Sequence, residues 1–294
     1  MSGLDIRQLH SLFVAEIGGV DLRRPVAQLP LGALQEAIDH YAVLVFRGAP
    51  LDQDQQLEFA AAFGALETSG IIRTGRKFRL HEKLADISNV DENERVLDPG
   101  DRRRMSNLGN LLWHTDSSFK DTPAKYSLLH AHVVPSEGGE TQFVDMRAAY
   151  DGLPDKTKAK IDGLVAEHSI FESRAKIGFT SFTDEERAAM PPARQSLVRV
   201  HPASGRKTLY LASHAAHIVD WPIPEGKCLL MDLIEHATQP QFVHTHHWQP
   251  GDLVMWDNRC TMHRGRPHDP AEKRDLRRAT IVDDGPTVPV RAAE

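Results

Sequence analysis

The sequence predicts a mainly β fold with flanking helices, arranged as an antiparallel sandwich or barrel. Short runs of β-forming residues fill the second half of the chain, and turn signals such as "PSEGG", "PASGRK" and "QPGD" separate them. These runs do not alternate one for one with helical segments, as the strands of a doubly wound parallel sheet would. No linker-like stretch divides the 294 residues, so we expect a single domain over 1–294.

Helical patterns dominate the first part of the chain. Within 29–48, Leu31, Leu34 and Ile38 share one helical face, and the run "AVLVFRG" that follows is typical of a strand closed by glycine. A second helix is expected over 51–64, with Gly64 as its C-cap.

The segment 70–110 is charged and irregular, and it contains the loop-like run "DPGDRRRMSN". One interpretation is an ordinary solvated loop. The other is a lid that closes over an anionic substrate, in which Arg73 and Arg79 of the basic run "RTGRKFR" would contact the substrate.

Five short segments are predicted to form the sheets, and two helical insertions interrupt them. The predicted strands are 126–134, 138–146, 195–202, 207–213 and 251–258. The predicted helices are 146–168 and 225–239. The run "RRATIVDD", near the end of the chain, is rich in β-forming residues and predicts a further strand.

Composition excludes several classes of function. The formal net charge is −6 and no long basic run occurs, so nucleic acid is not an expected partner. No apolar run approaches the roughly 20 residues that span a bilayer, and no signal-peptide pattern occurs, so no membrane partner is expected. Cys228 and Cys260 are the only cysteines and form no CxxC pair, which predicts a cytoplasmic protein without a disulfide framework.

The motif "WHTDSSF" is a candidate metal site. His114 and Asp116 are two residues apart, so on a strand both side chains would leave the same face and reach one ion. Two histidines and a carboxylate form the facial triad of non-haem Fe(II) centres. The alternative is a polar pair that binds no metal. Spacing does not choose the second histidine: His263 is the best candidate, and its competitors are His201, His214, His217, His244, His246, His247 and His268.

Four motifs, taken in order, resemble the taurine/2,4-D dioxygenase family of Fe(II)- and 2-oxoglutarate-dependent enzymes. They are "WHTDSSF", "GGETQFVDMRAAYDGLP", "GDLVMWDNRCTMHRGR" and "RDLRRAT", and the likeness runs from near residue 43 to near 280. Segments such as "LDQDQQLEFAAAFGALE" and "ADISNV" look closest to the branch that cleaves 2,4-dichlorophenoxyacetate and related aryloxyalkanoates. The resemblance implies a double-stranded β-helix, or jelly-roll, core.

The resemblance also implies a ligand set and a cosubstrate site. It makes His114, Asp116 and His263 the ligands of Fe(II), and it assigns Thr141 and Arg274 to the far carboxylate of 2-oxoglutarate. Arginine suits that carboxylate because its guanidinium is permanently charged and binds in a bidentate manner.

Three further residues are candidate substrate contacts. Arg278 matches the arginine that the family assigns to the acidic head group of the substrate, and on a strand it would share a face with Arg274. Asn110 would contact substrate near the metal or cap a turn. His214 stands where much of the family has an Asn and a Phe-Thr pair, which suggests either a pocket reshaped for an aromatic ring or a satisfied core histidine.

The implied reaction consumes O2 and 2-oxoglutarate and hydroxylates the carbon next to the ether oxygen of an aryloxyalkanoate. Its products are a phenol, a 2-oxo acid (glyoxylate from an acetate side chain), succinate and CO2. The alternatives are a relative that acts on another carboxylate or a sulfonate such as taurine, a Zn²⁺ hydrolase with the same ligands, and a non-catalytic binding protein. A zinc hydrolase would not need Arg274 and Thr141. Family analogy also predicts a homo-oligomer.

Overall fold

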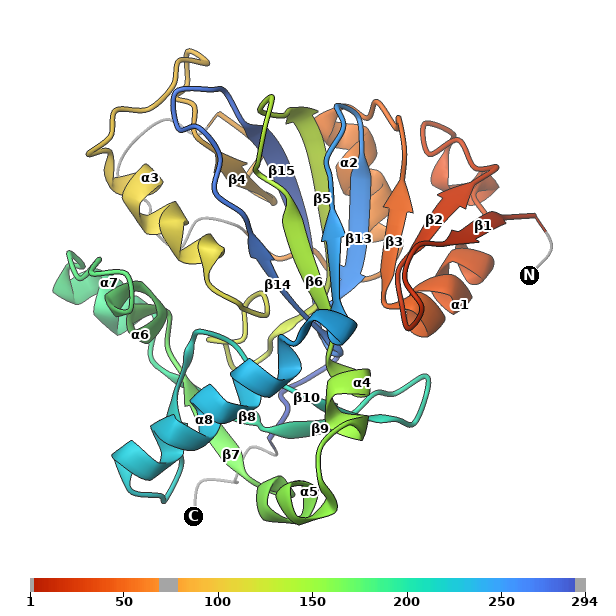
Figure 1. The fold of residues 1–294 in the computed structure, drawn as a ribbon. Coiled ribbons are helices and arrows are strands. Elements are labelled where there is room, and N and C mark those ends of the chain that lie inside the picture. The colour runs from red at the N-terminus through yellow and green to blue at the C-terminus, as the bar shows by residue number, and fades with distance from the viewer. Residues whose placement is uncertain (1–2, 69–78, 289–294) are drawn as a thin grey trace.

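The computed structural model describes residues 3–68 and 79–288, so the predicted substrate contact Arg73 lies outside the described residues. The prediction of a mainly β fold with flanking helices is confirmed (Figure 1). The described strands are β1 Asp5–Gln8, β2 Ala15–Gly18, β3 Val43–Phe46, β4 Leu84–Ser88, β5 Ala124–Val133, β6 Thr141–Asp145, β7 Val165–His168, β8 Ala193–Ser196, β9 Val198–Val200, β10 Lys207–Leu209, β11 Ala215–Ile218, β12 Val243–His246, β13 Leu253–Asp257, β14 Thr261–Gly265 and β15 Asp275–Val282.

The helices lie outside the two main sheets (Figure 1). They are α1 Leu31–Tyr41, α2 Gln53–Ala61, α3 Arg102–Asn107, α4 Met146–Asp151, α5 Asp155–Ile161, α6 Ile170–Ala175, α7 Asp184–Ala189 and α8 Ile223–Ala237, with the short 3-10 turns η1 Val26–Gln28, η2 Leu108–Leu111 and η3 Pro240–Phe242.

Two sheets form the jelly-roll core. The larger has seven strands in the order β1-β2-β3-β13-β5-β15-β4, and the smaller has the order β12-β6-β14. Strands that are far apart in the sequence are neighbours in both sheets, and apart from β2 and β3 these neighbours are antiparallel. β7, β8 and β11 form a further three-stranded sheet, which lies with α8 at one end of the molecule (Figure 1).

Side chains of the central strand β13 point alternately to its two faces and so contribute to two separate layers of the core. Val254 and Trp256 pack in a cluster with Phe143 of β6, which lies between the two main sheets. Leu253 and Met255 point the other way and join the cluster beneath the helices α1 and α2. All five residues of β13 are buried, and the first four of them are apolar, so this part of the strand is apolar on both faces.

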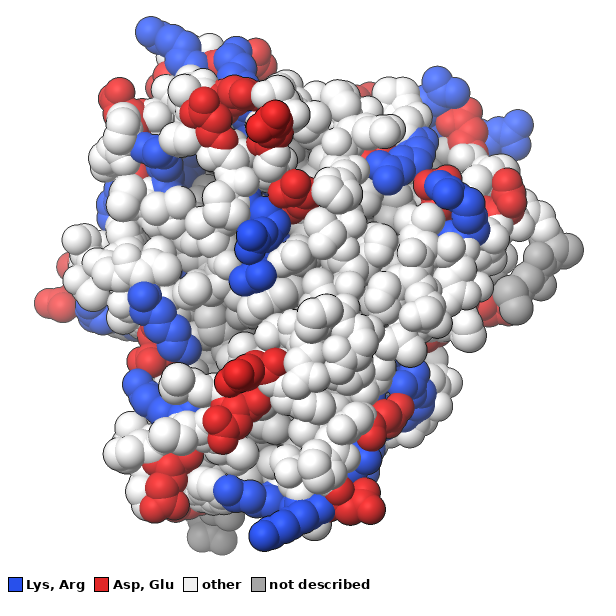
Figure 2. Space-filling model, viewed as in Figure 1, with Lys and Arg blue, Asp and Glu red and all other residues white. Residues whose placement is uncertain are grey.

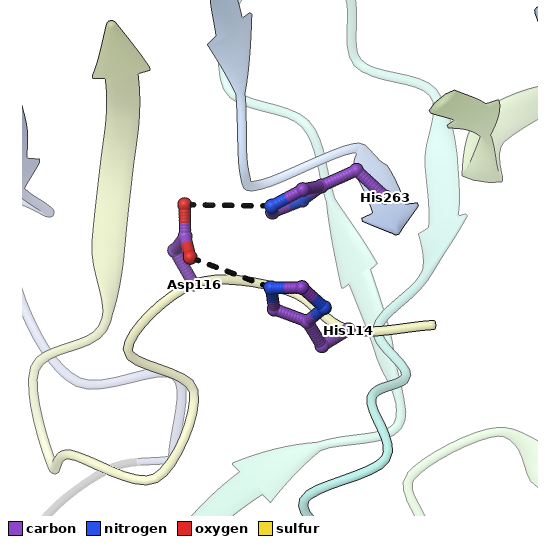
Figure 3. Close-up of side chains that lie close together, drawn as sticks. All are labelled: His114, Asp116 and His263. Atoms are coloured by element: carbon purple, nitrogen blue, oxygen red, sulfur yellow. Dashed lines mark ion pairs between the residues drawn. The ribbon is translucent and has the colours of Figure 1, made fainter. Parts of the chain in front are cut away.

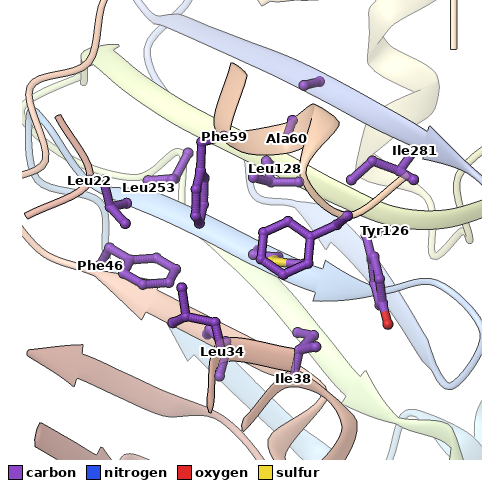
Figure 4. Packing of buried hydrophobic residues seen from close by; sticks show 14 of the residues in the cluster. Leu22, Leu34, Ile38, Phe46, Phe59, Ala60, Tyr126, Leu128, Leu253 and Ile281 are labelled. Carbon is purple, nitrogen blue, oxygen red and sulfur yellow. The ribbon is translucent and has the colours of Figure 1, made fainter. Parts of the chain in front are cut away.

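The helices α1 and α2 cover the outer face of the larger sheet (Figure 4). Leu34 and Ile38 of α1 are fully buried there, as their helical spacing predicts, and Phe59 of α2 packs against them over the sheet. Asp52 caps the start of α2, because its side chain accepts from the backbone N–H of Gln55 in a capping box. These contacts leave the inner face of the sheet free to form the site.

Several predicted boundaries were wrong. The predicted helix 146–168 ends in the strand β7, and between its two helices Gly152 and Pro154 interrupt the helical pattern. The residue that caps the end of α2 is Ala62, two residues before Gly64. The segment 70–110 is not irregular throughout, because its described part contains β4, α3 and η2. The predicted strand 195–202 is divided between β8 and β9.

Charges of both signs are mixed on the surface. On the face shown in Figure 2, lysine and arginine alternate with aspartate and glutamate, and neither sign forms a continuous patch. Among the helices of residues 3–68 and 79–288, none is both long and apolar enough to cross a membrane.

Candidate metal and cosubstrate site

The backbone brings His114 and His263 together. His263 lies on β14, and the two residues form an isolated antiparallel bridge in which each N–H donates to the other's carbonyl, at 2.9 and 2.8 Å. His114 and Asp116 do not share one regular strand, because Asp116 follows the bridge in a turn that places Ser117 at φ +51°. The turn nevertheless directs Asp116 towards both histidines.

The three side chains converge on one point (Figure 3). The His114 Nε2 and His263 Nε2 atoms lie 3.8 Å from the two carboxylate oxygens of Asp116. One donor atom from each residue lies within 4.8 Å of the others, and all three side chains are buried. Among the competitors of His263, none that the structure describes joins this group.

Neighbouring groups fix the orientation of two of these side chains. The His114 Nδ1 atom lies 2.7 Å from the carbonyl of Leu112, so Nδ1 carries the proton and Nε2 presents its lone pair. Asp116 accepts a hydrogen bond from the hydroxyl of Ser127 on β5, at 2.7 Å. Asn258 donates to Ser127 and accepts from the Asp116 backbone N–H, so it supports the carboxylate from two sides.

The site keeps its donors in the form that binds a cation. Burial lowers the pKa of His114 and lowers that of His263 well below its usual range, so both imidazoles are neutral at pH 7. Burial alone would raise the pKa of Asp116, but the positive charge of Arg278 holds it below its usual value. Two neutral imidazoles and one ionised carboxylate fit the ligand set of a non-haem Fe(II) ion.

A second group of metal-ligand types does not fit a cation. His201, Asp257 and Cys260 are buried close together. However, Arg259 binds both oxygens of Asp257, at 2.9 and 2.6 Å, and His201 donates to the same carboxylate. Burial also raises the pKa of the Cys260 thiol well above its usual range, which keeps it protonated. Asp257 is therefore neutralised by protein groups.

Arg274 is suited to bind an anion. It directly precedes β15 and is 9% exposed, and its Nη2 atom donates to the carbonyl of Gly139 at 3.2 Å. No carboxylate of the described residues lies within ion-pair distance of it, and burial lowers its pKa to about 10. A Cβ at Gly139 would lie 3.2 Å from the Arg274 Nε atom and 2.9 Å from Pro135, so glycine makes room for the guanidinium.

Thr141 begins β6, two residues after Gly139. Its hydroxyl accepts a hydrogen bond from the Trp248 indole at 3.0 Å, which leaves the hydroxyl proton free to donate elsewhere. Arg274 contacts Gly139, two residues before Thr141, and together the two side chains offer the donors that a dicarboxylate such as 2-oxoglutarate requires.

The predicted substrate contacts lie in different surroundings. Arg278 of β15 makes a close ion pair with Asp116, and His214 is buried with its ring 6.0 Å from that of His114. Asn110 lies in η2, four residues before His114. Arg79 is bound by Asp86 and Asp275, both at close range, so its predicted contact with substrate stays a prediction.

Sequence reasoning missed the residues that support the ligands. Ser127, Trp248 and Asn258 occur in predicted strands or in a strand-flanking motif, but a single polar residue in such a run has no spacing that marks it. Their role becomes visible only when the fold brings Ser127 and Asn258 to Asp116, and Trp248 to Thr141.

Comparison with known proteins agrees with this geometry. The family model described as "Taurine catabolism dioxygenase TauD, TfdA family" matches residues 5–280. The chain is 48% identical to the alpha-ketoglutarate-dependent 2,4-dichlorophenoxyacetate dioxygenase of Cupriavidus pinatubonensis, over 94% of this chain and 96% of that protein. It is 38% identical to the (S)-phenoxypropionate/alpha-ketoglutarate-dioxygenase of Sphingobium herbicidovorans, over 95% of both chains.

The solved structure of AAD-2 in complex with Mn(II) and N-oxalylglycine resembles this chain closely. The TM-score is 0.93 with 49% sequence identity, over 97% of this chain and 99% of that chain. The family match covers most of the sequence, and the inner face of the sheets carries the His-Asp-His group and a buried arginine. The chain therefore belongs to the TauD/TfdA family of 2-oxoglutarate-dependent dioxygenases.

Proposed function

We propose that this protein is an Fe(II)- and 2-oxoglutarate-dependent dioxygenase that hydroxylates the carbon next to the ether oxygen of an aryloxyalkanoate such as 2,4-dichlorophenoxyacetate. The products are a phenol and a 2-oxo acid, glyoxylate from an acetate side chain, together with succinate and CO2. The observation that carries the proposal is 48% identity to a 2,4-dichlorophenoxyacetate dioxygenase over almost the whole chain.

The ligand set supports the choice of metal. His114, Asp116 and His263 would hold Fe(II) through two neutral imidazoles and a carboxylate, a set that leaves open positions for cosubstrates. When bound there, Fe(II) supplies the activation of O2 that is coupled to decarboxylation of 2-oxoglutarate. The hydrogen bond from His114 Nδ1 to Leu112 and that from Ser127 to Asp116 keep two ligands in place.

The other side chains bind and orient the two acids. Arg274 and Thr141 would bind the far carboxylate of 2-oxoglutarate, because each has donors that the protein leaves free. Arg278 would face the carboxylate of the substrate, and His214 and Asn110 would border the space beside His114. Four expectations stay predictions: a homo-oligomer, a cytoplasmic location, the absence of nucleic-acid and membrane partners, and the closure of a lid by 70–110.

A panel of acids tests the proposal. Protein reconstituted without oxygen with Fe(II) and 2-oxoglutarate should show the visible metal-to-ligand charge-transfer band of the chelate. On admitting O2, 2,4-dichlorophenoxyacetate and (S)-2-phenoxypropionate should give equal amounts of succinate and phenol. Taurine is the comparison substrate. Phenol release without O2 would indicate a hydrolase, and turnover of taurine alone would move the proposal to a sulfonate.

A histidine variant tests the ligand assignment. His114→Ala should abolish substrate-dependent succinate formation, because it removes an imidazole from the only described site that brings together these three ligands. The matched control is His247→Ala, which removes an exposed histidine that is not part of the group and should leave turnover unchanged. Turnover retained by His114→Ala would refute the assignment.

A further inference from the structure

Arg174, on the short helix α6, has a guanidinium with unused donors. Its Nη1 atom donates to Ser173 at 3.2 Å, whereas its Nε atom is buried without a hydrogen-bond partner. No carboxylate among the residues that the structure describes is within ion-pair distance, and Glu294 is the only acidic residue outside them. A buried N–H of a permanent cation costs free energy unless an acceptor reaches it.

Two chain segments hold Arg174 beside the candidate metal site. On one side the guanidinium packs on Gly109, where an added Cβ would lie 2.3 Å from Nη1. On the other side Ser173 forms a 2.7 Å hydrogen bond with Ser213, whose N–H donates to the carbonyl of Trp113. Gly109 and Trp113 belong to the segment that leads into His114, so Arg174 lies at the border of the site.

The charges near Arg174 are not balanced by the protein. Arg174 and Arg278 are close enough that burial and the charge of Arg278 lower the pKa of Arg174 to about 10. Asp116 contacts Arg278, but this carboxylate is also a candidate metal ligand. The Nε atom of Arg278 is likewise buried without a partner. Arg174 and Arg278 therefore carry two positive charges and have unused donors, while only one carboxylate, which they share with the metal site, lies near them. An anionic ligand would balance this charge.

We propose that Arg174 binds the carboxylate of the primary substrate together with Arg278, and so selects acids over neutral aryl ethers. The inference rests on the proposed function, since it names a residue of the same site. The far carboxylate of 2-oxoglutarate has its own donors in Arg274 and Thr141, which lie at the starts of β15 and β6. The remaining cosubstrate group that could reach Arg174 is the 1-carboxylate of 2-oxoglutarate. The test distinguishes binding of this group from binding of the substrate carboxylate.

The test compares the affinities of three ligands in Arg174→Gln. Without oxygen, formation of the charge-transfer band gives the Kd of 2-oxoglutarate, and its perturbation gives the Kd of 2,4-dichlorophenoxyacetate or of the neutral amide of that acid. We expect the Kd of the acid to rise about 10- to 100-fold, as for the loss of a charge-assisted pair of hydrogen bonds. The Kd values of the amide and of 2-oxoglutarate should change less than about threefold.

Two variants and one control complete the experiment. Arg174→Lys keeps the charge and should recover part of the affinity. Gly109→Ala keeps Arg174 but displaces its guanidinium, so it should also weaken binding of the acid more than binding of the amide. Arg187→Gln, on the neighbouring helix α7, removes an arginine that stacks on Phe171 and should change no Kd.

Each contrary outcome has a distinct meaning. An unchanged Kd of the acid in Arg174→Gln overturns the inference. Equal losses of affinity for the acid and the amide would mean that Arg174 only shapes the pocket, which also overturns the inference. A loss of affinity for 2-oxoglutarate alone would mean that Arg174 binds the cosubstrate instead. If the wild-type protein releases no phenol from any aryloxyalkanoate, the proposed function itself fails and the inference falls with it.

Discussion

At the scale of single residues, the carboxylate of Asp116, which lies in a turn, depends on a side chain from the larger sheet. Ser127 is fully buried on β5 and donates to Asp116, while Asn258 donates to Ser127 at 2.9 Å. A carboxylate that is oriented in this way binds a cation without first having to be ordered.

Removing the hydroxyl of Ser127 tests this arrangement. Ser127→Ala leaves an oxygen of Asp116 and the amide of Asn258 without their partner, so we expect the Kd of Mn(II) to rise about 10- to 100-fold. Titration of the metal-free protein with Mn(II), followed by calorimetry or electron paramagnetic resonance, measures the change. Ser127→Thr keeps the hydroxyl and serves as the control. If Ser127→Ala binds Mn(II) as tightly as wild type, the hydroxyl does not orient the ligand.

At the scale of elements, ion pairs tie the edge strand β4 to its neighbour β15. Arg79 lies before β4, and its guanidinium binds both oxygens of Asp275 at 2.8 Å and those of Asp86 at 2.9 and 3.3 Å. Burial alone would raise the pKa of Asp275, but Arg79 and Arg277 hold it well below its usual range. These contacts support the start of β15, where Arg274 is positioned.

Arg79→Met should therefore act on stability. We expect a loss of about 2 to 3 kcal/mol in the free energy of unfolding at pH 7, since one partner of a buried ion pair is removed. The loss should shrink below about pH 4, because the depressed pKa of Asp275 contributes stability only where the unfolded carboxyl is ionised. Urea unfolding measures it, and Arg95→Met, which removes a 77% exposed arginine, should change less than about 0.5 kcal/mol.

The same variant separates two roles of Arg79. A purely structural arginine predicts that surviving Arg79→Met enzyme has a nearly unchanged KM for the aryloxyalkanoate. A KM that rises more than about tenfold while stability is unchanged would instead support the substrate contact that the sequence predicts.

Local patterns predicted the elements where apolar spacing was regular. The faces of α1 and α8 and the apolar runs of β5, β13 and β15 could be read directly. The strand β7 was read as the end of a helix, because its four residues follow helical segments with no turn signal that is stronger than Gly163. β4 was missed because it holds two polar positions within a charged segment and is ordered by pairing with β15.

Some residues of the site could be predicted from the sequence, and others could not. A histidine and an aspartate two apart carry little information alone, and only the ordered motifs pointed to His263 and Arg274. Arg174 and Ser127 carried no local signal, since they lie 60 and 13 residues beyond His114. Ser127 reaches Asp116 from β5, and Arg174 is held in place by the hydrogen bond between its neighbour Ser173 and Ser213. Contacts of this kind depend on topology, which spacing along one segment does not contain.

At the scale of the whole molecule, buried and half-buried histidines make folding sensitive to acid. His132 on β5, His168 on β7 and His244 on β12 belong to three different sheets. Burial lowers the pKa of each, to about 4, 3 and 4 respectively. In the unfolded chain these histidines bind protons near pH 6.5, whereas in the folded protein they stay neutral there. The free energy of unfolding should therefore fall as the pH drops from about 6.5 towards 4.

This acid sensitivity can be assigned to a single histidine. In metal-free protein, His132→Gln should flatten the fall of Tm between pH 7 and pH 5. Since His132 is half-exposed and solvent screens its charge, it contributes at most about 1 kcal/mol to the difference in unfolding free energy. Scanning calorimetry at several pH values measures the slope, and His247→Gln, an exposed histidine, should leave it as in wild type. Equal slopes for His132→Gln and wild type would mean that His132 accepts its proton in the folded protein as readily as in the unfolded chain. The acid sensitivity would then have to come from His168 and His244, or from carboxylates such as Asp257 and Asp275, whose pKa values are held low by arginines.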